Sequence, residues 1–442
     1  MNTPVYDFLK KYSSSGTLRC HMPGHKGYTL SPELSQLYSM DITEIHGADS
    51  LFEADGIIAQ SEKNMSELYG TAGTVFSAGG STLCIQAMLA IMKAEKRKIF
   101  AVRNVHRAFL NAAALLDLDV GWILPEYSGG ILSGNINPED VENALKNCHV
   151  PSAVYVTSPD YTGKTADISL LADICHKYNA CLLTDNAHGV HLKFLNPDIH
   201  PMTLGADLCC DSAHKMFPAL TGSAMLHTSV TEYVPLLKQN MSMFASTSPS
   251  YLIMMSLDLC NRYISEKIYD DIQKNIVWLE NFRRKFSDRL VFAETEPFHI
   301  TVKAGESGFD GNELAGLLRK NGVECEYSDS SLVILLMSPV CTKDDYERLS
   351  VSLSKSLVQA EKHPVCTDCF SMELPERVMS IREAVFSECE VIPVEKAENR
   401  ICASVKVPCP PAVPIVASGE RIDRNSINIF RKYGISEIIV VK

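Results

Sequence analysis

Strand-like and helix-like apolar segments alternate from residue 98 to residue 215, and this alternation constrains the fold more than any other feature. The strand candidates are short apolar runs, whereas the helix candidates repeat their apolar residues every three to four positions. Such alternation predicts an α/β fold with a mostly parallel sheet between layers of helices, which binds ligands at the carboxyl ends of its strands. We expect strands over residues 98–102, 120–124, 153–157, 181–185 and 206–210, and helices over residues 108–116, 138–146 and 170–178.

Lys215 stands where one of these strands ends, in the sequence Asp211-Ser212-Ala213-His214-Lys215. A solvated or salt-bridged surface lysine is the ordinary alternative. A lysine buried without a partner loses its proton more readily, because burial disfavours the ammonium. The free amine is the form that makes a Schiff base with an aldehyde cofactor. Lys215 is therefore a candidate for that bond.

Three further features make pyridoxal phosphate (PLP) the cofactor that Lys215 predicts. Asp185 ends another strand, 30 residues before Lys215, and PLP needs an acid that keeps its ring nitrogen protonated. Gly80-Ser81-Thr82 opens a helix, where backbone N–H groups, two hydroxyls and the helix dipole make an anion site. His106 follows a third strand, where an imidazole can stack on a pyridine ring. The combination favours a PLP site over the ordinary alternatives, which are a capped helix and a structural histidine.

The composition excludes several classes of partner. A formal net charge of -12 over 442 residues offers no basic face to nucleic acid. No run approaches the length of a membrane span, and the N-terminus has no apolar signal segment. An odd number of cysteines, 15, suits a reducing compartment better than a disulfide framework. We therefore expect a cytoplasmic protein that binds neither nucleic acid nor membrane.

No metal site is expected from the sequence. In His21-Met22-Pro23-Gly24-His25 the proline and glycine break any helix that would bring both imidazoles onto one face. Cys366-Thr367-Asp368-Cys369 is a lone C-x-x-C without the second pair that a zinc ribbon requires. Both segments are therefore interpreted without a metal.

The character of the chain changes twice. Residues 1–70 suggest an N-terminal arm, extended and with little periodic structure apart from a polar helix near residues 61–69. Residues 71–290 contain the alternating segments and are expected to form the large, PLP-binding domain. Residues 291–442 suggest a smaller α+β domain, with strands over 298–302 and 331–336 and a helix over 312–320.

Seven motifs occur along the chain in this order: His21-Met22-Pro23-Gly24-His25-Lys26-Gly27, Asp41-Ile42-Thr43-Glu44, Gly80-Ser81-Thr82, Asp185-x-Ala187-His188-Gly189, Ser212-Ala213-His214-Lys215, Ser246-Thr247-Ser248-Pro249-Ser250-Tyr251 and Pro410-Pro411-Ala412-Val413-Pro414. Together they resemble the bacterial ornithine/lysine/arginine decarboxylases of the aspartate-aminotransferase fold. The resemblance extends from about residue 4 to residue 423 and corresponds to the short form without an N-terminal wing domain. It implies a fold type I large domain with a mostly parallel seven-stranded sheet, and a smaller C-terminal α+β domain.

The resemblance also implies roles for individual residues. Lys215 would bind the PLP aldehyde, Asp185 would pair with the ring nitrogen, and His214 or Lys215 would return a proton to the substrate carbon. The active site would lie at the subunit interface of a homodimer or a larger even oligomer. Asp49 and Glu420 are our candidates for the far end of a cationic substrate, which needs a carboxylate when it is desolvated. The cofactor-binding set is Gly80, Ser81, Thr82, His106, Asp185, Ala187, His188, Ser212, His214 and Lys215.

The expected function is PLP-dependent decarboxylation of a basic L-amino acid that feeds polyamine synthesis. Arginine is the first choice, because short relatives without the wing domain often feed polyamine synthesis. Lysine and ornithine are close behind. One alternative is an aminotransferase or lyase, since fold alone does not separate these reactions. Another is a non-catalytic paralogue that binds PLP or polyamines. In place of two adjacent acids and a histidine found in many relatives, this chain has Asp49-Ser50-Leu51-Phe52.

Overall fold

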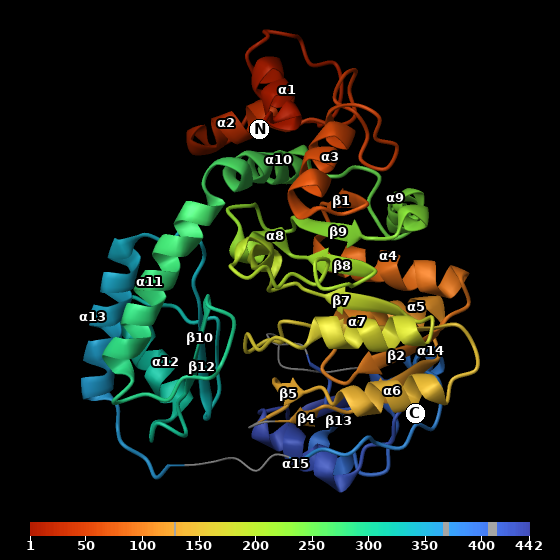
Figure 1. Cartoon of the computed structure of the whole chain (residues 1–442), viewed down its shortest axis with the longest axis vertical. Helices are drawn as coiled ribbons and strands as arrows, with labels where there is room; N and C mark the ends of the chain where they lie inside the picture. Colours follow the sequence, from red (N-terminus) through yellow and green to blue (C-terminus); the bar gives the residue numbers. More distant parts are fainter. Residues whose placement is uncertain (128–129, 366–370, 405–412) are drawn as a thin grey trace. The chain divides into compact units, whose positions relative to one another are not determined.

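The strands of the predicted alternating segments lie in a seven-stranded sheet (Figure 1). The computed structural model describes residues 1–127, 130–365, 371–404 and 413–442. Strand β9 runs antiparallel to β1 and β8, whereas the pairs β7/β8, β2/β6 and β2/β3 are parallel. The expected α/β class with a mostly parallel sheet is thus confirmed. The strand order is β1 (Gly73–Ser77), β9 (Ala224–Thr228), β8 (Leu208–Asp211), β7 (Cys181–Asp185), β6 (Ser152–Thr157), β2 (Lys98–Val102) and β3 (Val120–Ile123).

Two compact units make up the chain, and the first contains residues Met1–Glu95 and Cys181–Asp271. Strands β7, β8 and β9 are buried along their whole lengths, as expected for apolar runs in the middle of a sheet. Besides its strands, this unit contains α1 (Pro4–Ser13), α2 (Ser35–Met40), α3 (Ile57–Tyr69), α4 (Gly80–Ala94), α8 (Ala213–Met216), α9 (Val234–Ser242), α10 (Tyr251–Glu266) and the 3-10 turns η1 (Pro32–Leu34), η2 (Val190–Phe194) and η3 (Thr231–Tyr233).

The N-terminal segment is more helical than the sequence suggested, so the expectation of little periodic structure was wrong. Pro4 occupies the first turn of α1, where its missing N–H costs nothing. Val5 and Leu9, four residues apart, are both fully buried. The backbone N–H of Tyr6 donates to the Asp258 carboxylate on α10. Tertiary burial therefore stabilises a helix whose apolar pattern is too short to stand out in sequence.

The second unit contains residues Lys96–Ala180 and Ile272–Lys442. Its core includes Ile334, Ile415 and Phe430, drawn from segments far apart in the sequence. Two small sheets have the orders β10-β12-β11 and β13-β15-β14, and β4 pairs with β5. Its further elements are β4 (Glu126–Tyr127), β5 (Gly134–Asn135), β10 (His299–Lys303), β11 (Tyr327–Ser328), β12 (Leu332–Leu336), β13 (Cys389–Pro393), β14 (Cys402–Ser404), β15 (Glu437–Val441), α5 (Arg107–Leu116), α6 (Pro138–Lys146), α7 (Ile168–Lys177), α12 (Gly311–Lys320), α13 (Lys343–Gln359), α14 (Ile381–Phe386), η4 (Val394–Lys396) and α15 (Arg424–Lys432), while α11 (Ile268–Phe286) begins in the first unit.

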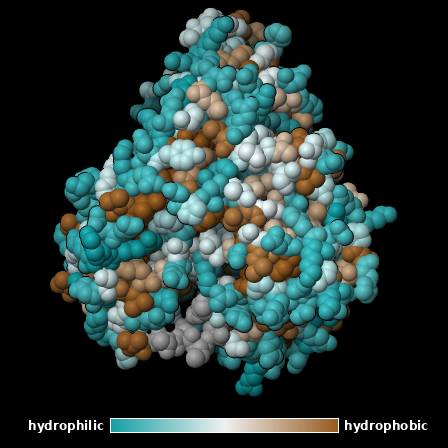
Figure 2. All heavy atoms as spheres, in the orientation of Figure 1, coloured by the Kyte–Doolittle hydropathy of each residue, from teal (hydrophilic) through white to brown (hydrophobic). Residues whose placement is uncertain are grey.

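The domain boundaries expected near residues 70 and 290 stay predictions. Cys366-Thr367-Asp368-Cys369 and the Pro410-Pro411-Ala412 part of the tail motif lie outside the described residues. Figure 2 shows a surface on which hydrophilic side chains predominate and apolar ones are scattered. The helices that the structure describes include none long and apolar enough to cross a membrane.

Candidate active site

Lys215 is positioned by the end of a buried strand and a single helical turn. Strand β8 ends at Asp211, Ser212 directly precedes the turn, and α8 carries His214 and Lys215. The Lys215 Nζ atom lies 2.9 Å from Nε2 of His188. His188 is 5% exposed and belongs to the loop after β7. The expected placement of Lys215 at the carboxyl end of a strand is therefore observed, and it faces a second predicted residue.

Asp185 ends β7, beside β8 in the sheet, and is 2% exposed. Its parallel register places it opposite Cys210. Its Oδ1 atom accepts from the backbone N–H of Ala187 at 3.3 Å and from the Cys210 thiol at 3.6 Å. Burial raises the pKa of that thiol, so Cys210 stays a neutral donor. A buried carboxylate of this kind is suited to hold a protonated ring nitrogen.

The start of α4 meets the turn that follows α8. The backbone N–H of Gly80 donates to the carbonyl of Gly222 at 2.8 Å. Gly80 has a φ of +69°, and a Cβ there would contact nothing within 4 Å. Next to Gly222, the Ser223 carbonyl accepts from Nδ1 of His214 at 2.8 Å. The hydroxyls of Ser212 and Ser223 are buried without a hydrogen-bond partner among the described residues.

These groups fit the phosphate of PLP. A helix start offers backbone N–H groups and a positive dipole end, and Ser81 and Thr82 occupy the first turn of α4. Two buried hydroxyls without partners are costly unless a ligand accepts their hydrogen bonds. The first unit thus contains most of the residues predicted for the site, namely Gly80, Ser81, Thr82, Asp185, Ala187, His188, Ser212, His214 and Lys215.

His106 belongs to the second unit and caps α5. Its Nδ1 atom accepts from the backbone N–H of Ala108 at 3.1 Å, so that nitrogen is unprotonated and Nε2 carries the ring proton. The cap fixes the orientation of the imidazole at the carboxyl end of β2. Its stacking on a cofactor ring stays a prediction.

Both candidate substrate carboxylates accept hydrogen bonds from the protein itself. The Asp49 carboxylate accepts from five backbone N–H groups, including those of Gly56 and Ile58 at the start of α3. Burial alone would raise the pKa of Asp49, but these donors hold it below its ordinary value. Glu420 is 2% exposed and lies 2.6 Å from Nη2 of Arg103. Their substrate roles stay predictions.

The sequence interpretation missed a set of buried polar residues around Asp211. Asp211 accepts hydrogen bonds from Asn186, and it contacts the imidazoles of His200 and His227. Asn186 and Asp211 directly neighbour predicted residues, which is a signal that was available. His200 and His227 carry no such signal, because only the fold brings their imidazoles to Asp211.

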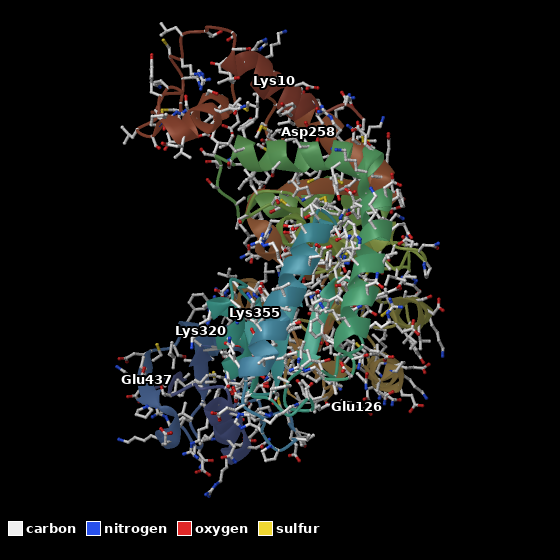
Figure 3. All side chains as sticks on the ribbon, turned by 90° about the vertical axis from the view of Figure 1, so that its left-hand side faces the viewer. Lys10, Glu126, Asp258, Lys320, Lys355 and Glu437 are labelled. Atoms are coloured by element: carbon white, nitrogen blue, oxygen red, sulfur yellow. The ribbon has the colours of Figure 1, made fainter. Side chains whose placement is uncertain are left out.

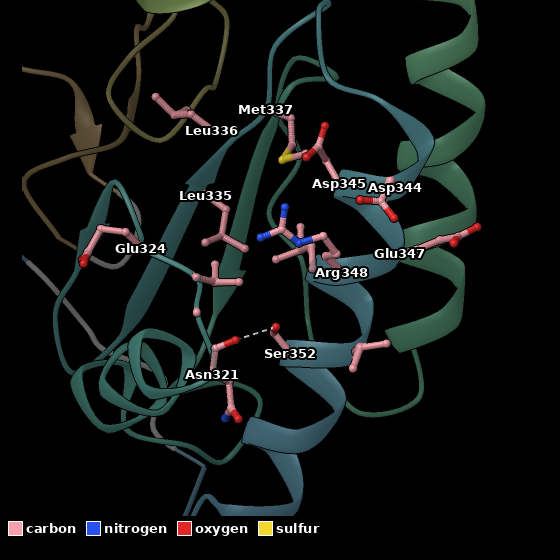
Figure 4. A pocket seen from close by; sticks show the side chains of 14 residues that line it. Asn321, Glu324, Leu335, Leu336, Met337, Asp344, Asp345, Glu347, Arg348 and Ser352 are labelled. Carbon is pink, nitrogen blue, oxygen red and sulfur yellow. Dashed lines mark hydrogen bonds between the residues drawn. The ribbon is translucent and has the colours of Figure 1, made fainter. Parts of the chain in front are cut away.

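A separate open pocket of about 580 Å³ lies in the second unit (Figure 4). It is lined by the segment directly after α12, by the end of β12 and by α13. Leu335 and Met337 line it together with charged groups such as Asp345 and Arg348. The Ser352 hydroxyl donates to the Asn321 carbonyl at 2.8 Å across its wall. None of the predicted site residues line this pocket. It is therefore a different feature from the candidate active site.

Comparisons with known proteins identify the family of the chain. Residues 3–305 match the family model described as Orn/Lys/Arg decarboxylase, major domain, and residues 364–433 match its C-terminal domain. An arginine decarboxylase of Bacillus subtilis (strain 168) is 28% identical over 456 residues, covering 97% of this chain and 93% of the relative. An arginine decarboxylase of Bacillus anthracis is 27% identical, covering 97% and 92%.

Solved structures show the same fold. A lysine decarboxylase of Francisella novicida has a TM-score of 0.81 at 16% identity, covering 99% of this chain and 79% of that chain. Lysine decarboxylase A of Pseudomonas aeruginosa has a TM-score of 0.80 at 19% identity, covering 98% and 76%. A structure of SPT with PLP has a TM-score of 0.56 at 11% identity, covering 80% and 84%. The expected fold type is thus confirmed.

Proposed function

Since the chain belongs to the Orn/Lys/Arg decarboxylase family, we propose that it is a PLP-dependent decarboxylase that converts L-arginine to the corresponding amine and carbon dioxide. Decarboxylation of a basic amino acid follows from the family and from the curated relatives. Arginine is preferred because those relatives are arginine decarboxylases, whereas the lysine decarboxylases are similar below 25% identity and inform the fold. The product amine suits polyamine synthesis.

The observation that carries the proposal is the convergence of Lys215, Asp185 and the start of α4 within one unit. Lys215 and His188 are in direct contact, β7 and β8 pair side by side, and Gly80 bonds to the turn after α8. A lysine, a buried carboxylate and an anion site are the three protein groups that PLP requires.

When bound, PLP supplies an electron sink that accepts the electrons left by departing carbon dioxide. Lys215 would hold its aldehyde, and Asp185 would keep its ring nitrogen protonated. Ser212, Ser223, His214 and the N–H groups at the start of α4 would hold its phosphate. These residues orient the cofactor before substrate arrives, so that little ordering remains to be done in the reaction.

His188 and Lys215 are placed to handle the proton that replaces the carboxylate. Their nitrogens lie 2.9 Å apart, so one must donate a hydrogen bond and the other accept it, and the two groups cannot both be fully protonated. Lys215 is our candidate for returning a proton to the substrate carbon, with His188 as its relay. His214 is the second candidate if its Nε2 faces the substrate instead of the phosphate, because its Nδ1 donates to Ser223.

We further propose a homodimer in a reducing compartment. The N-terminal segment exposes Leu18, Tyr28 and Leu30, which are 83%, 81% and 106% exposed, and large apolar side chains gathered in one segment favour a protein contact. No disulfide joins the cysteines that the structure describes. Sedimentation of the purified protein measures the assembly directly.

The function is tested by purifying the protein with PLP, recording its visible spectrum, and measuring carbon dioxide release from arginine, lysine and ornithine in parallel. We expect a cofactor band and release that is fastest from arginine, and both should vanish in Lys215→Ala. A band without carbon dioxide release from any of the three would overturn the decarboxylase proposal. In that case an aminotransferase, a lyase or a binding role would be indicated. Faster release from lysine or ornithine would overturn the choice of arginine.

A further inference from the structure

A buried carboxylate that the proposed reaction does not use lies directly before the turn that carries Lys215. Asp211 is the last residue of β8 and is 0% exposed. Its Oδ1 atom accepts from Nδ2 of Asn186 at 2.6 Å. Its Oδ2 atom lies 3.0 Å from Nε2 of His200 and 3.2 Å from Nε2 of His227. Three segments of the first unit therefore converge on one carboxylate.

The protonation of the two imidazoles follows from their other contacts. Nδ1 of His200 accepts the backbone N–H of Met202 at 3.3 Å, so Nε2 carries the proton and donates to Asp211. Nδ1 of His227 lies 2.8 Å from the Thr74 hydroxyl, which can donate to it. Burial lowers the pKa of His227. Both imidazoles can therefore donate Nε2–H to the Asp211 carboxylate.

The hydrogen-bond donors around Asp211 stabilise its negative charge. Burial by itself would raise the pKa of Asp211, but the contacts from His200 and His227 hold it well below its usual range. Hydrogen bonds to a buried anion are stronger than neutral ones. The Asn186 amide is therefore held firmly against the end of β8.

Asn186 follows Asp185 directly, and its other contacts also restrain it. Its backbone N–H donates to the Cys210 carbonyl at 2.9 Å, and its carbonyl accepts from Gly189 at 2.8 Å. A Cβ on Gly189 would come within 1.9 Å of the Asn186 Oδ1 atom. The side chain thus occupies a slot shaped by a glycine. Because Asn186 follows Asp185 directly, this restraint acts on the residue next to Asp185.

We infer that Asp211 is a positioning residue that, through Asn186, ties the loop after Asp185 to the turn that carries Lys215. The tie sets the separation of the two groups that would hold the ring and the aldehyde of the cofactor. This inference rests on the proposed function, because it assigns those two residues to PLP. Asp211 itself contacts neither substrate nor cofactor in this assignment.

Two other interpretations of the cluster give different results in the same experiment. His200, Cys209 and Asp211 offer ligand atoms that lie within 4.8 Å of one another, as in a metal site. The cluster could also stabilise the fold without influencing the cofactor. A metal assay and a melting curve detect these two cases.

The test is a double-mutant cycle of Asp211→Ala and Asn186→Ala on the full-length protein loaded with PLP. The measurements are the PLP dissociation constant and the pH midpoint of the cofactor's visible band, both taken well below the melting temperature. Each single variant should weaken PLP binding about tenfold, as expected for a lost buried hydrogen bond, and shift the midpoint in the same direction. The double variant should be no worse than either single variant, because both remove one tie.

Asp211→Asn is the conservative control. The introduced amide oxygen can accept hydrogen bonds from the two imidazoles. The introduced NH₂ can donate to Asn186 Oδ1 once the Asn186 amide has flipped. PLP binding should therefore stay within about threefold of wild type. The inference would be overturned if the losses of PLP affinity in the two single variants multiplied in the double variant. It would also be overturned if the pH midpoint of the visible band were unchanged and only the melting temperature fell. Stoichiometric metal that is lost in Asp211→Ala would also overturn it.

Failure of this inference is distinguishable from failure of the proposed function. A wild type that binds PLP but releases no carbon dioxide refutes the decarboxylase and leaves the cycle interpretable. If the wild type is active and the variants keep an unchanged cofactor band, the tie is refuted and the decarboxylase proposal is unaffected.

Discussion

Arg103 and Glu420 form an ion pair from which water is almost excluded, with Nη2 2.6 Å from Oε2 and side chains that are 0% and 3% exposed. The Arg103 guanidinium also lies over the Trp122 ring, 4.5 Å from its centroid. Glu420 accepts a further bond from the backbone N–H of Ala417. The pair therefore joins the end of β2 to the segment that follows β14, within the second unit.

Removing Glu420 should destabilise the protein strongly. Glu420→Ala leaves Arg103 as an uncompensated buried charge, which costs about 3–5 kcal/mol in the free energy of unfolding. Glu376→Ala is the matched control, because its partner Arg421 is 38% exposed and a surface pair contributes about 0–1 kcal/mol. Urea unfolding of both variants provides the measurement. Normal stability combined with a raised KM for arginine would instead support the substrate role predicted for Glu420.

His188 should contribute to turnover more than to cofactor binding. His188→Ala removes the partner of Lys215 and should lower kcat about 10²-fold, the usual effect of a general acid–base group. His188→Gln can keep a hydrogen bond to Lys215 but cannot relay a proton, so PLP binding should equal that of the wild type while kcat stays low. His149→Ala, at an exposed position, serves as control. Full activity of the Gln variant would rule out the relay.

Gly189→Ala should disturb the site through Asn186. The new Cβ would meet Asn186 Oδ1 at 1.9 Å and a Leu192 methyl at 2.7 Å, and overpacking of this kind costs about 1–3 kcal/mol. Gly316→Ala is the control: it lies inside α12 with nothing within 4 Å of an added Cβ, so it should stabilise by about 0.4–1 kcal/mol. Thermal melts with and without PLP compare the two. Equal effects would contradict the slot described for Asn186.

The pH dependence of stability should show the titration of Asp258. Burial raises the pKa of this carboxyl to about 6, although Ser61 and Tyr6 donate to it; Figure 3 shows it on α10. The folded state binds the Asp258 proton more tightly than the unfolded state does. Proton binding at Asp258 therefore adds fully to the free energy of unfolding below about pH 4, and this addition disappears as the pH rises through about 6. The expected loss is about 2–3 kcal/mol.

Asp258→Asn removes the titrating group and should flatten the stability curve between pH 4 and pH 6. Unfolding in urea at several pH values measures both curves. Parallel curves for wild type and variant would show that another group carries the dependence.

Much of the fold was predictable because its signals are local. The predicted strand over 98–102 and helix over 138–146 coincide with β2 and α6. Asn137 and Pro138 indicate the start of α6, because a helix cap and a first-turn proline depend only on near neighbours in the sequence. The candidate site was predicted in the same way, since Asp185 ends one apolar strand, Lys215 follows another, and strand ends are where α/β folds bind ligands. The roles of these residues stay predictions.

The sequence by itself determined the order of the strands and helices along the chain, the cofactor chemistry expected at the strand ends, and the family to which these motifs belong. Only the tertiary structure decided which buried groups meet. It joined Asn186 to Asp211, His188 to Lys215 and Arg103 to Glu420. The physical reason is that periodicity and capping depend on residues a few positions apart, whereas a buried polar group is satisfied by whichever partner the folded backbone brings within hydrogen-bonding distance.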